Sequence, residues 1–157
     1  MRKFFYVALI GLIALLVMPG VVSAAPSDTI TVTGSIGGSI DVTVTADVNF
    51  GAMTPGNTYT DTNTDLSVTS TFTSWTVSAT DQNAGANTGK MLSGTTPLTN
   101  AFRINKNAGA YQNLPYNGIL TGGAGSATAD IGFQQQVVPG DQAGAYSITV
   151  VFTGASS

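Results

Sequence analysis

Residues 40–50 read IDVTVTADVNF, and every second side chain in this stretch is apolar. The apolar members are Ile40, Val42, Val44, Ala46, Val48 and Phe50. A two-residue period places alternate side chains on opposite faces of a strand, so the stretch predicts a β-strand with one buried face. Beyond residue 24, no segment shows helical periodicity over three turns. The sequence therefore predicts an all-β protein.

The same alternation recurs along the chain. It is found at residues 30–36, 66–68, 75–79, 131–137 and 146–152, with shorter apolar runs at 102–104 and 119–120. Turns rich in Gly, Asn and Pro separate these runs. Short strands with turns at this spacing predict an immunoglobulin-like antiparallel β-sandwich of about 7–9 strands. A closed barrel is the alternative.

The first 24 residues have the features of a secretory signal peptide. Arg2 and Lys3 precede an apolar run over residues 4–18, and small residues then end at Ala24. The apolar run is shorter than the ~20 residues of a membrane span, so a retained anchor is the weaker alternative. We expect cleavage after Ala24 and no membrane span in the remaining chain, which we predict to be secreted to the cell surface.

The segment between the predicted cleavage site and the predicted sandwich domain of residues 39–157 has an alternating run of its own. Ile30, Val32 and Ile36 share one parity around Gly34, and two glycines follow as a hinge. Such a segment is either an ordinary first strand of its own domain or a donor strand that joins the edge of a neighbouring copy. We therefore treat residues 25–38 as an N-terminal strand and Gly-rich hinge.

Charge and residue types limit the expected chemistry. The chain contains eight Asp and Glu residues, all of them aspartates, and no histidine or cysteine. Three cations remain after the signal peptide, so the surface is acidic and nucleic acid is not an expected partner. The usual general base, thiol nucleophile and imidazole ligand are missing. We expect no enzyme activity, no catalytic or metal-binding residues and no cofactor.

Four aromatic or apolar residues are predicted to form the structural core. Trp75 and Val77 share one parity in a strand, and a lone Trp with apolar neighbours of its own parity is typical of a core anchor. Tyr146 follows a Pro-Gly turn at the start of the last alternating run, which is typical of a tyrosine corner. Phe152 lies in the same run as Tyr146 and shares its parity.

The polar stretch DTNTD, residues 61–65, has the D-x-N-x-D spacing with which a calcium loop begins. A calcium loop of the EF-hand type needs glycine at the next position and glutamate at the twelfth, where this chain has Leu66 and Phe72. Aspartates that cap a polar turn are the preferred interpretation, and a calcium-binding loop at Asp61–Asp65 is the alternative.

Four stretches occur in an order that resembles secreted WxL-type surface domains and, more distantly, spore coat protein U and pilin-like sandwiches. They are VNFGAMTPG (48–56), LSVTSTFTSWTVSATD (66–81), GKMLSGTTPLTNAF (89–102) and VPGDQAGAYSITVVF (138–152). The resemblance implies non-covalent attachment to cell-wall glycan through two W-x-L motifs. Trp75-Thr76-Val77 stands at the place of the first motif, and Phe152-Thr153-Gly154 stands at the place of the second.

We therefore expect a secreted, non-catalytic structural or adhesive domain at the cell surface that associates with envelope polymers or surface proteins. The first alternative is a homo-oligomer, a subunit of a pilus or other filament assembled by donor-strand exchange through residues 29–36. The second alternative is a carbohydrate- or calcium-binding module.

Overall fold

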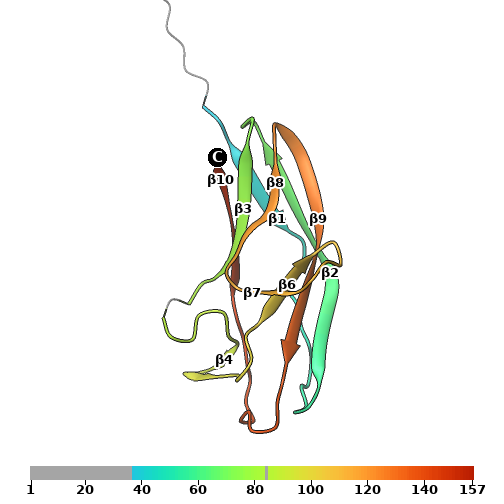
Figure 1. Cartoon of the computed structure of the whole chain (residues 1–157), viewed down its shortest axis with the longest axis vertical. Coiled ribbons are helices and arrows are strands. Elements are labelled where there is room, and N and C mark those ends of the chain that lie inside the picture. Colours follow the sequence, from blue (N-terminus) through green and yellow to red (C-terminus); the bar gives the residue numbers. More distant parts are fainter. Residues whose placement is uncertain (1–36, 84) are drawn as a thin grey trace, which may run out of the picture. The chain divides into compact units, whose positions relative to one another are not determined.

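The computed structural model describes residues 37–83 and 85–157, which contain ten β-strands and no helix (Figure 1). The strands are β1 (Ile40–Val44), β2 (Thr58–Ser70), β3 (Trp75–Asp81), β4 (Leu92–Ser93), β5 (Thr96–Pro97), β6 (Arg103–Lys106), β7 (Gln112–Asn113), β8 (Tyr116–Gly122), β9 (Gly125–Gln136) and β10 (Val150–Ser156). The all-β prediction is confirmed. Within the described part of the chain, no helix has the length and apolarity to cross a membrane. The predicted signal peptide and the run from Ile30 to Ile36 lie outside the described residues.

The strands form two main antiparallel sheets arranged like a sandwich. The larger sheet has the order β1-β2-β9-β6-β7, and the smaller sheet has the order β10-β3-β8. A third, two-stranded sheet consists of β4 and β5. Within the described residues, every pairing between these strands is antiparallel.

The core lies between the two main sheets and follows from the alternation. In β3, the buried and partly buried residues alternate without a break from Trp75 to Asp81. In β2, the second half of the strand alternates in the same way and buries Leu66 and Val68. Burying a large apolar side chain of this kind contributes roughly 1.5–3 kcal/mol. The sandwich is therefore held by one apolar layer that both sheets share.

Three stretches differ from the structure predicted for them. In the predicted strand over residues 146–152, regular pairing begins only at Val150. The predicted strand over residues 40–50 is paired only as far as Val44. The predicted turn at Asp61–Asp65 is wrong, because these residues lie inside β2. The register with β9 shifts between Asp61 and Thr64, and this bulge accommodates the turn-like bond from the Asn63 N–H to Asp61 Oδ1 at 2.9 Å.

The strands β1 and β10 are edge strands of different sheets, yet they lie next to each other. A Cβ atom added at Gly154 in β10 would lie 2.6 Å from Ile40 Cδ1 and 2.9 Å from Val42 Cγ2 in β1. The end of β10 therefore packs directly against the start of β1 (Figure 1). From this contact, the chain continues after β1 toward residue 50, and the chain before β10 extends back toward residue 146. The candidate site lies between these two segments.

Candidate functional site

The first wall of the candidate site is the chain segment that follows β1, residues 45–53. Its pairing with β2 ends at Thr45, whose N–H donates to the Asp65 carbonyl at 3.1 Å. Within the described residues, no backbone hydrogen bond joins residues 46–53 to a neighbouring strand. Val48 and Phe50 are nevertheless partly buried and pack against the core, as the alternation predicts. The segment thus has the side-chain pattern of a strand without a strand partner.

The second wall is residues 146–152, which comprise the segment before β10 and the first three residues of β10. Ser147 exchanges both backbone hydrogen bonds with Leu92, at 2.9 and 3.0 Å, and the Thr149 carbonyl accepts from the Gln82 N–H at 2.9 Å. These backbone hydrogen bonds join the odd-numbered residues Ser147 and Thr149 to Leu92 and Gln82, on the side away from the first wall. The even-numbered side chains are partly buried and line the site: Tyr146, Ile148, Val150 and Phe152.

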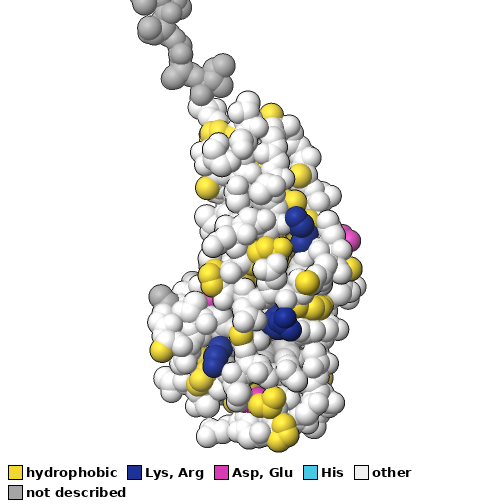
Figure 2. Space-filling view, in the orientation of Figure 1, with side chains coloured by type: hydrophobic (Ala, Val, Ile, Leu, Met, Phe, Trp, Pro, Cys, Tyr) yellow, Lys and Arg dark blue, Asp and Glu magenta, His cyan; other side chains and the backbone are white. Residues whose placement is uncertain are grey.

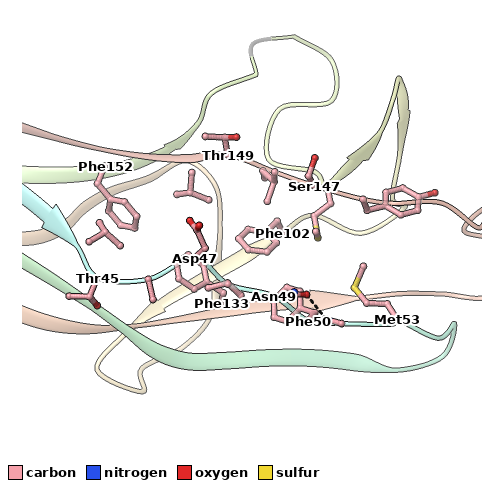
Figure 3. Close-up of a pocket in the computed structure, with 18 residues that line it drawn as sticks. Thr45, Asp47, Asn49, Phe50, Met53, Phe102, Phe133, Ser147, Thr149 and Phe152 are labelled. Carbon is pink, nitrogen blue, oxygen red and sulfur yellow. Dashed lines mark hydrogen bonds between the residues drawn. The ribbon is translucent and has the colours of Figure 1, made fainter.

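Between the two walls lies an open groove of about 650 Å³. Phe102, Phe133 and Met91 form its floor, and each of these residues is at least 92% buried. The ring centroids of Phe102 and Phe133 are 5.7 Å apart, and Phe50 stands 6.3 Å from Phe102. Figure 3 shows these rings between the walls, with the ring of Phe152 at one end. The groove therefore has an aromatic floor and a volume typical of binding sites.

The walls also offer backbone hydrogen-bonding groups to the groove. In an antiparallel ladder, the N–H and C=O groups of successive residues point alternately toward the partner strand and away from it. Because Ser147 and Thr149 bond to the far side, the backbone groups of Ile148 and Val150 are directed toward the groove. The same alternation holds at the end of β1. The backbone N–H of Thr45 bonds to β2, so the backbone groups of Val44 point away from β2 and toward the groove. Both walls therefore have the geometry of open sheet edges.

The groove is closed at one end and charged at one point. It ends where Gly154 packs against Ile40 and Val42, since no strand fits between these residues. Asp47 is the only charged residue among those that line the groove, and Figure 3 shows its carboxylate between the two walls. The site is thus apolar along its floor, carries one carboxylate between its walls and extends to Phe50 and Met53.

Charges are sparse on the surface as well. The described residues contain three cations, Lys90, Arg103 and Lys106, and Figure 2 shows the Lys and Arg side chains of one face as separate spots. Lysines and other charges at sheet edges normally discourage the addition of a foreign strand. Neither wall of the groove contains a lysine or an arginine. The edges beside the groove therefore lack this protection.

Two titratable groups of the described residues, Tyr59 and Asp141, have shifted pKa values. Hydrogen bonds with Thr54 lower the pKa of the Tyr59 phenol, whose oxygen accepts from the Thr54 N–H at 2.7 Å. Burial acts to raise the pKa of the Asp141 carboxyl, but hydrogen bonds from Thr99 and Val138 outweigh it, and the pKa is lowered. Both groups hold loops in place. In the described part of the chain, no three carboxylates are grouped to hold a metal ion, and Asp61 Oδ1 accepts from the chain itself.

The four residues predicted for the core lie in two different places. Trp75 is 1% exposed, and its indole N–H donates to the Gly123 carbonyl at 2.6 Å. Val77 is completely buried beside it. The ring of Trp75 therefore offers no face to an external glycan. Tyr146 and Phe152, by contrast, are partly buried in the second wall, and the Tyr146 hydroxyl donates to the Gln142 carbonyl at 2.8 Å.

The sequence pattern alone does not reveal the groove. The pattern placed Phe50 and Ile148 correctly on apolar faces of alternating runs, but the alternation does not show that the two runs face each other without a strand between them. The floor residues Phe102 and Phe133 also lie in predicted strands, with no local signal that they border an open site. Comparison of the chain with protein-family models, curated proteins and solved structures finds no match.

Proposed function

We propose that this protein is a secreted, non-catalytic structural domain, an immunoglobulin-like sandwich whose groove binds an extended apolar β-strand. One observation carries the proposal. The segments 45–50 and 146–150 both alternate, both lack a strand partner on the side of the groove, and face each other across a space of about 650 Å³. A strand placed there would join the edges of β1 and β10.

Two kinds of contact would hold such a strand. Its backbone would bond to the outward groups of the walls, and every second side chain would cover the aromatic floor, as in other cases of strand addition. Each buried Val or Ile side chain of the strand would contribute roughly 1.5–3 kcal/mol from the area removed from water. The groove thus favours a partner that is extended and apolar on one face.

The groove also sets the length and charge of its partner. The stretch from Val44, at the end of β1, to Phe50 in the first wall has seven residues, and seven residues of extended chain span about 23 Å. Asp47 between the walls disfavours an anionic side chain at that point of the partner. An uncharged strand of about seven residues with alternating Val or Ile therefore fits the site. We propose that such strands belong to proteins at the cell surface with which this domain assembles.

The test measures binding of a synthetic peptide with the sequence of residues 28–38, DTITVTGSIGG, to the full chain carrying Val32→Asp. The substitution prevents the same sequence in other copies of the chain from competing with the peptide. We expect the peptide to raise the melting temperature and to bind with a measurable Kd, and a peptide with the same Val→Asp change to do neither. Absence of binding to the well-folded V32D chain would refute the proposed function.

Two matched variants assign the binding to the groove. Val44 lines the groove and is 36% exposed, whereas Val151 is 37% exposed and has the opposite parity to the groove-lining residues of β10. Val44→Lys should abolish peptide binding, because it places a charge beside the apolar floor. Val151→Lys should bind the peptide as before. Equal loss of affinity in both variants would place the binding outside the groove.

A further inference from the structure

We propose that the strand in the groove is the segment Ile30–Ile36 of a second copy of this chain, and that the chain's own segment does not fill it. This inference rests on the proposed function, because it names the partner of the same groove. The segment has the required chemistry: seven uncharged residues with Ile30, Val32 and Ile36 on one face. The structure decides from which copy it comes.

The hinge between the segment and β1 is anchored to β2 and to the following turn. The Ser39 N–H donates to Thr71 Oγ1 at 2.8 Å, and the Thr71 N–H donates to the Ser39 carbonyl at 3.0 Å. A side chain at Gly38 would overlap the ring of Phe72, so residue 38 is also held in place. Gly37, in contrast, has no atoms near its open side. A chain that folds back toward the groove must therefore reverse at or before Gly37.

A tight reversal at this point conflicts with the bonds already made. In a two-residue hairpin with Gly37-Gly38 at its tip, the Ser39 N–H would donate to the carbonyl of residue 36. That N–H is already directed at Thr71 Oγ1. The returning strand would then run beside residues 40–44, where Gly154 packs against Ile40 and Val42. A paired strand needs about 4.8 Å on each side, and this end of the groove has no such space.

The register gives a second argument against the chain's own segment. In the two-residue hairpin residue 36 is level with Ser39, so residue 31 is level with Val44 and residue 25 with Phe50. Ile30, Val32 and Ile36 would then be level with Thr45, Thr43 and Ser39, whose side chains are exposed. Directly opposite residues of an antiparallel pair have their side chains on the same face of the sheet. The three apolar side chains would therefore point away from the aromatic floor.

The segment of a second copy is free of these constraints. It can enter at the end near Phe50 and Met53, away from the close packing at Gly154, and place all three apolar side chains over the floor. Each copy then gives a strand to one neighbour and receives a strand from another. Such a contact is head-to-tail, and it generates an open filament unless the rotation between copies closes a ring. The expected assembly is therefore a ladder of linear oligomers.

The test distinguishes the role of a copy as strand donor from its role as strand acceptor. The full chain is expressed with export, so that cellular processing defines its N-terminus, and assemblies are sized by gel filtration and native mass spectrometry. Val32→Asp removes the donor and keeps the groove, and V44K blocks the groove and keeps the donor. We expect a ladder from the unmodified chain and monomers from each variant. When the two variants are refolded together, they should form a dimer and nothing longer.

Two control substitutions lie beside the donor position Val32 and on the face of β10 that is turned away from the groove. Thr33→Asp puts a charge on the opposite face of the donor segment, and Val151→Lys lies away from the groove; both variants should still form the ladder. Monomers from the unmodified chain, or no dimer from the mixed variants, would overturn the inference. Peptide binding to V32D would, in that case, leave the strand-binding function standing. A ladder formed by V32D alone would also overturn the inference, because assembly would then use another surface.

Discussion

The two halves of the stretch 40–50 have the same alternating pattern but different surroundings. Residues 40–44 pair with β2 along their whole length and pack against Gly154 on the other side. Residues 45–50 continue the pattern beside a groove that contains no strand. The comparison teaches that a two-residue period specifies an extended segment with an apolar face, whereas the partner of that segment depends on the rest of the fold. An alternating segment without a partner is where we propose that another chain binds.

The paired half belongs to the closed end of the sandwich, where Trp75 is the largest buried side chain. Trp75→Ala would remove the indole and its bond to Gly123, and we expect a loss of about 3–5 kcal/mol in the free energy of unfolding. Urea denaturation followed by circular dichroism measures this loss. Trp75→Phe should cost less because the ring remains. A loss below about 1 kcal/mol for the alanine variant would show that the closed end tolerates a cavity of this size.

The contact that closes the groove can be forced apart at Gly154. Valine at this position would place methyl groups where Ile40 and Val42 lie, and overpacking of this kind costs about 1–3 kcal/mol. Ala155→Val, at the neighbouring position of opposite parity, should change the stability by less than about 0.5 kcal/mol. Faster amide exchange in β1 of G154V than in A155V would show that β1 separates from β10. Equal stability of the two variants would contradict the close packing.

Particular residues show how far the sequence predicts this molecule. The alternation around Trp75, Leu66 and Ile131 predicts their strands, because burial of one face leaves a local two-residue signature. The polar stretch Asp61–Asp65 could not be recognised as strand, because its pairing with β9 is specified by long-range register and by a bulge. The groove depends on the same kind of information. The groove requires that two runs about 100 residues apart in the sequence face each other across a gap. The sequence of neither run specifies the width of that gap.

A loop that supports the second wall should respond to acid. Asp141 accepts from the Thr99 N–H and hydroxyl, at 2.8 and 2.7 Å, and from the Val138 N–H at 2.9 Å. Because these bonds lower the pKa of Asp141 in the folded protein, they stabilise it above the unfolded pKa of about 4. This contribution should be lost as the pH falls through the lower, folded pKa. Solvent screening limits it to about 1 kcal/mol.

Asp141→Asn tests this effect through the difference in unfolding free energy between the variant and the parent, measured from pH 7 down to pH 2. The difference should be largest at pH 7 and should shrink in acid, because the parent loses its advantage as its carboxyl is protonated. Asp130→Asn, at an exposed position of β9, serves as the control. A difference for Asp141→Asn that stays constant over this pH range would assign the stabilisation to packing rather than to charge.

The smallest expected effect comes from the hydroxyl of Tyr146, which lies in the second wall and donates to the Gln142 carbonyl at 2.8 Å. Tyr146→Phe keeps the ring at the groove and removes one partly exposed hydrogen bond, so the loss should be about 0.5–1 kcal/mol. Peptide affinity should stay unchanged, because the ring still contacts the groove. Amide exchange at Ser147 should become faster, since the bond holds the segment that leads to the pair with Leu92. A fall in affinity without faster exchange would instead show that the hydroxyl contacts the bound strand, so this variant separates a support of the wall from a part of the binding surface.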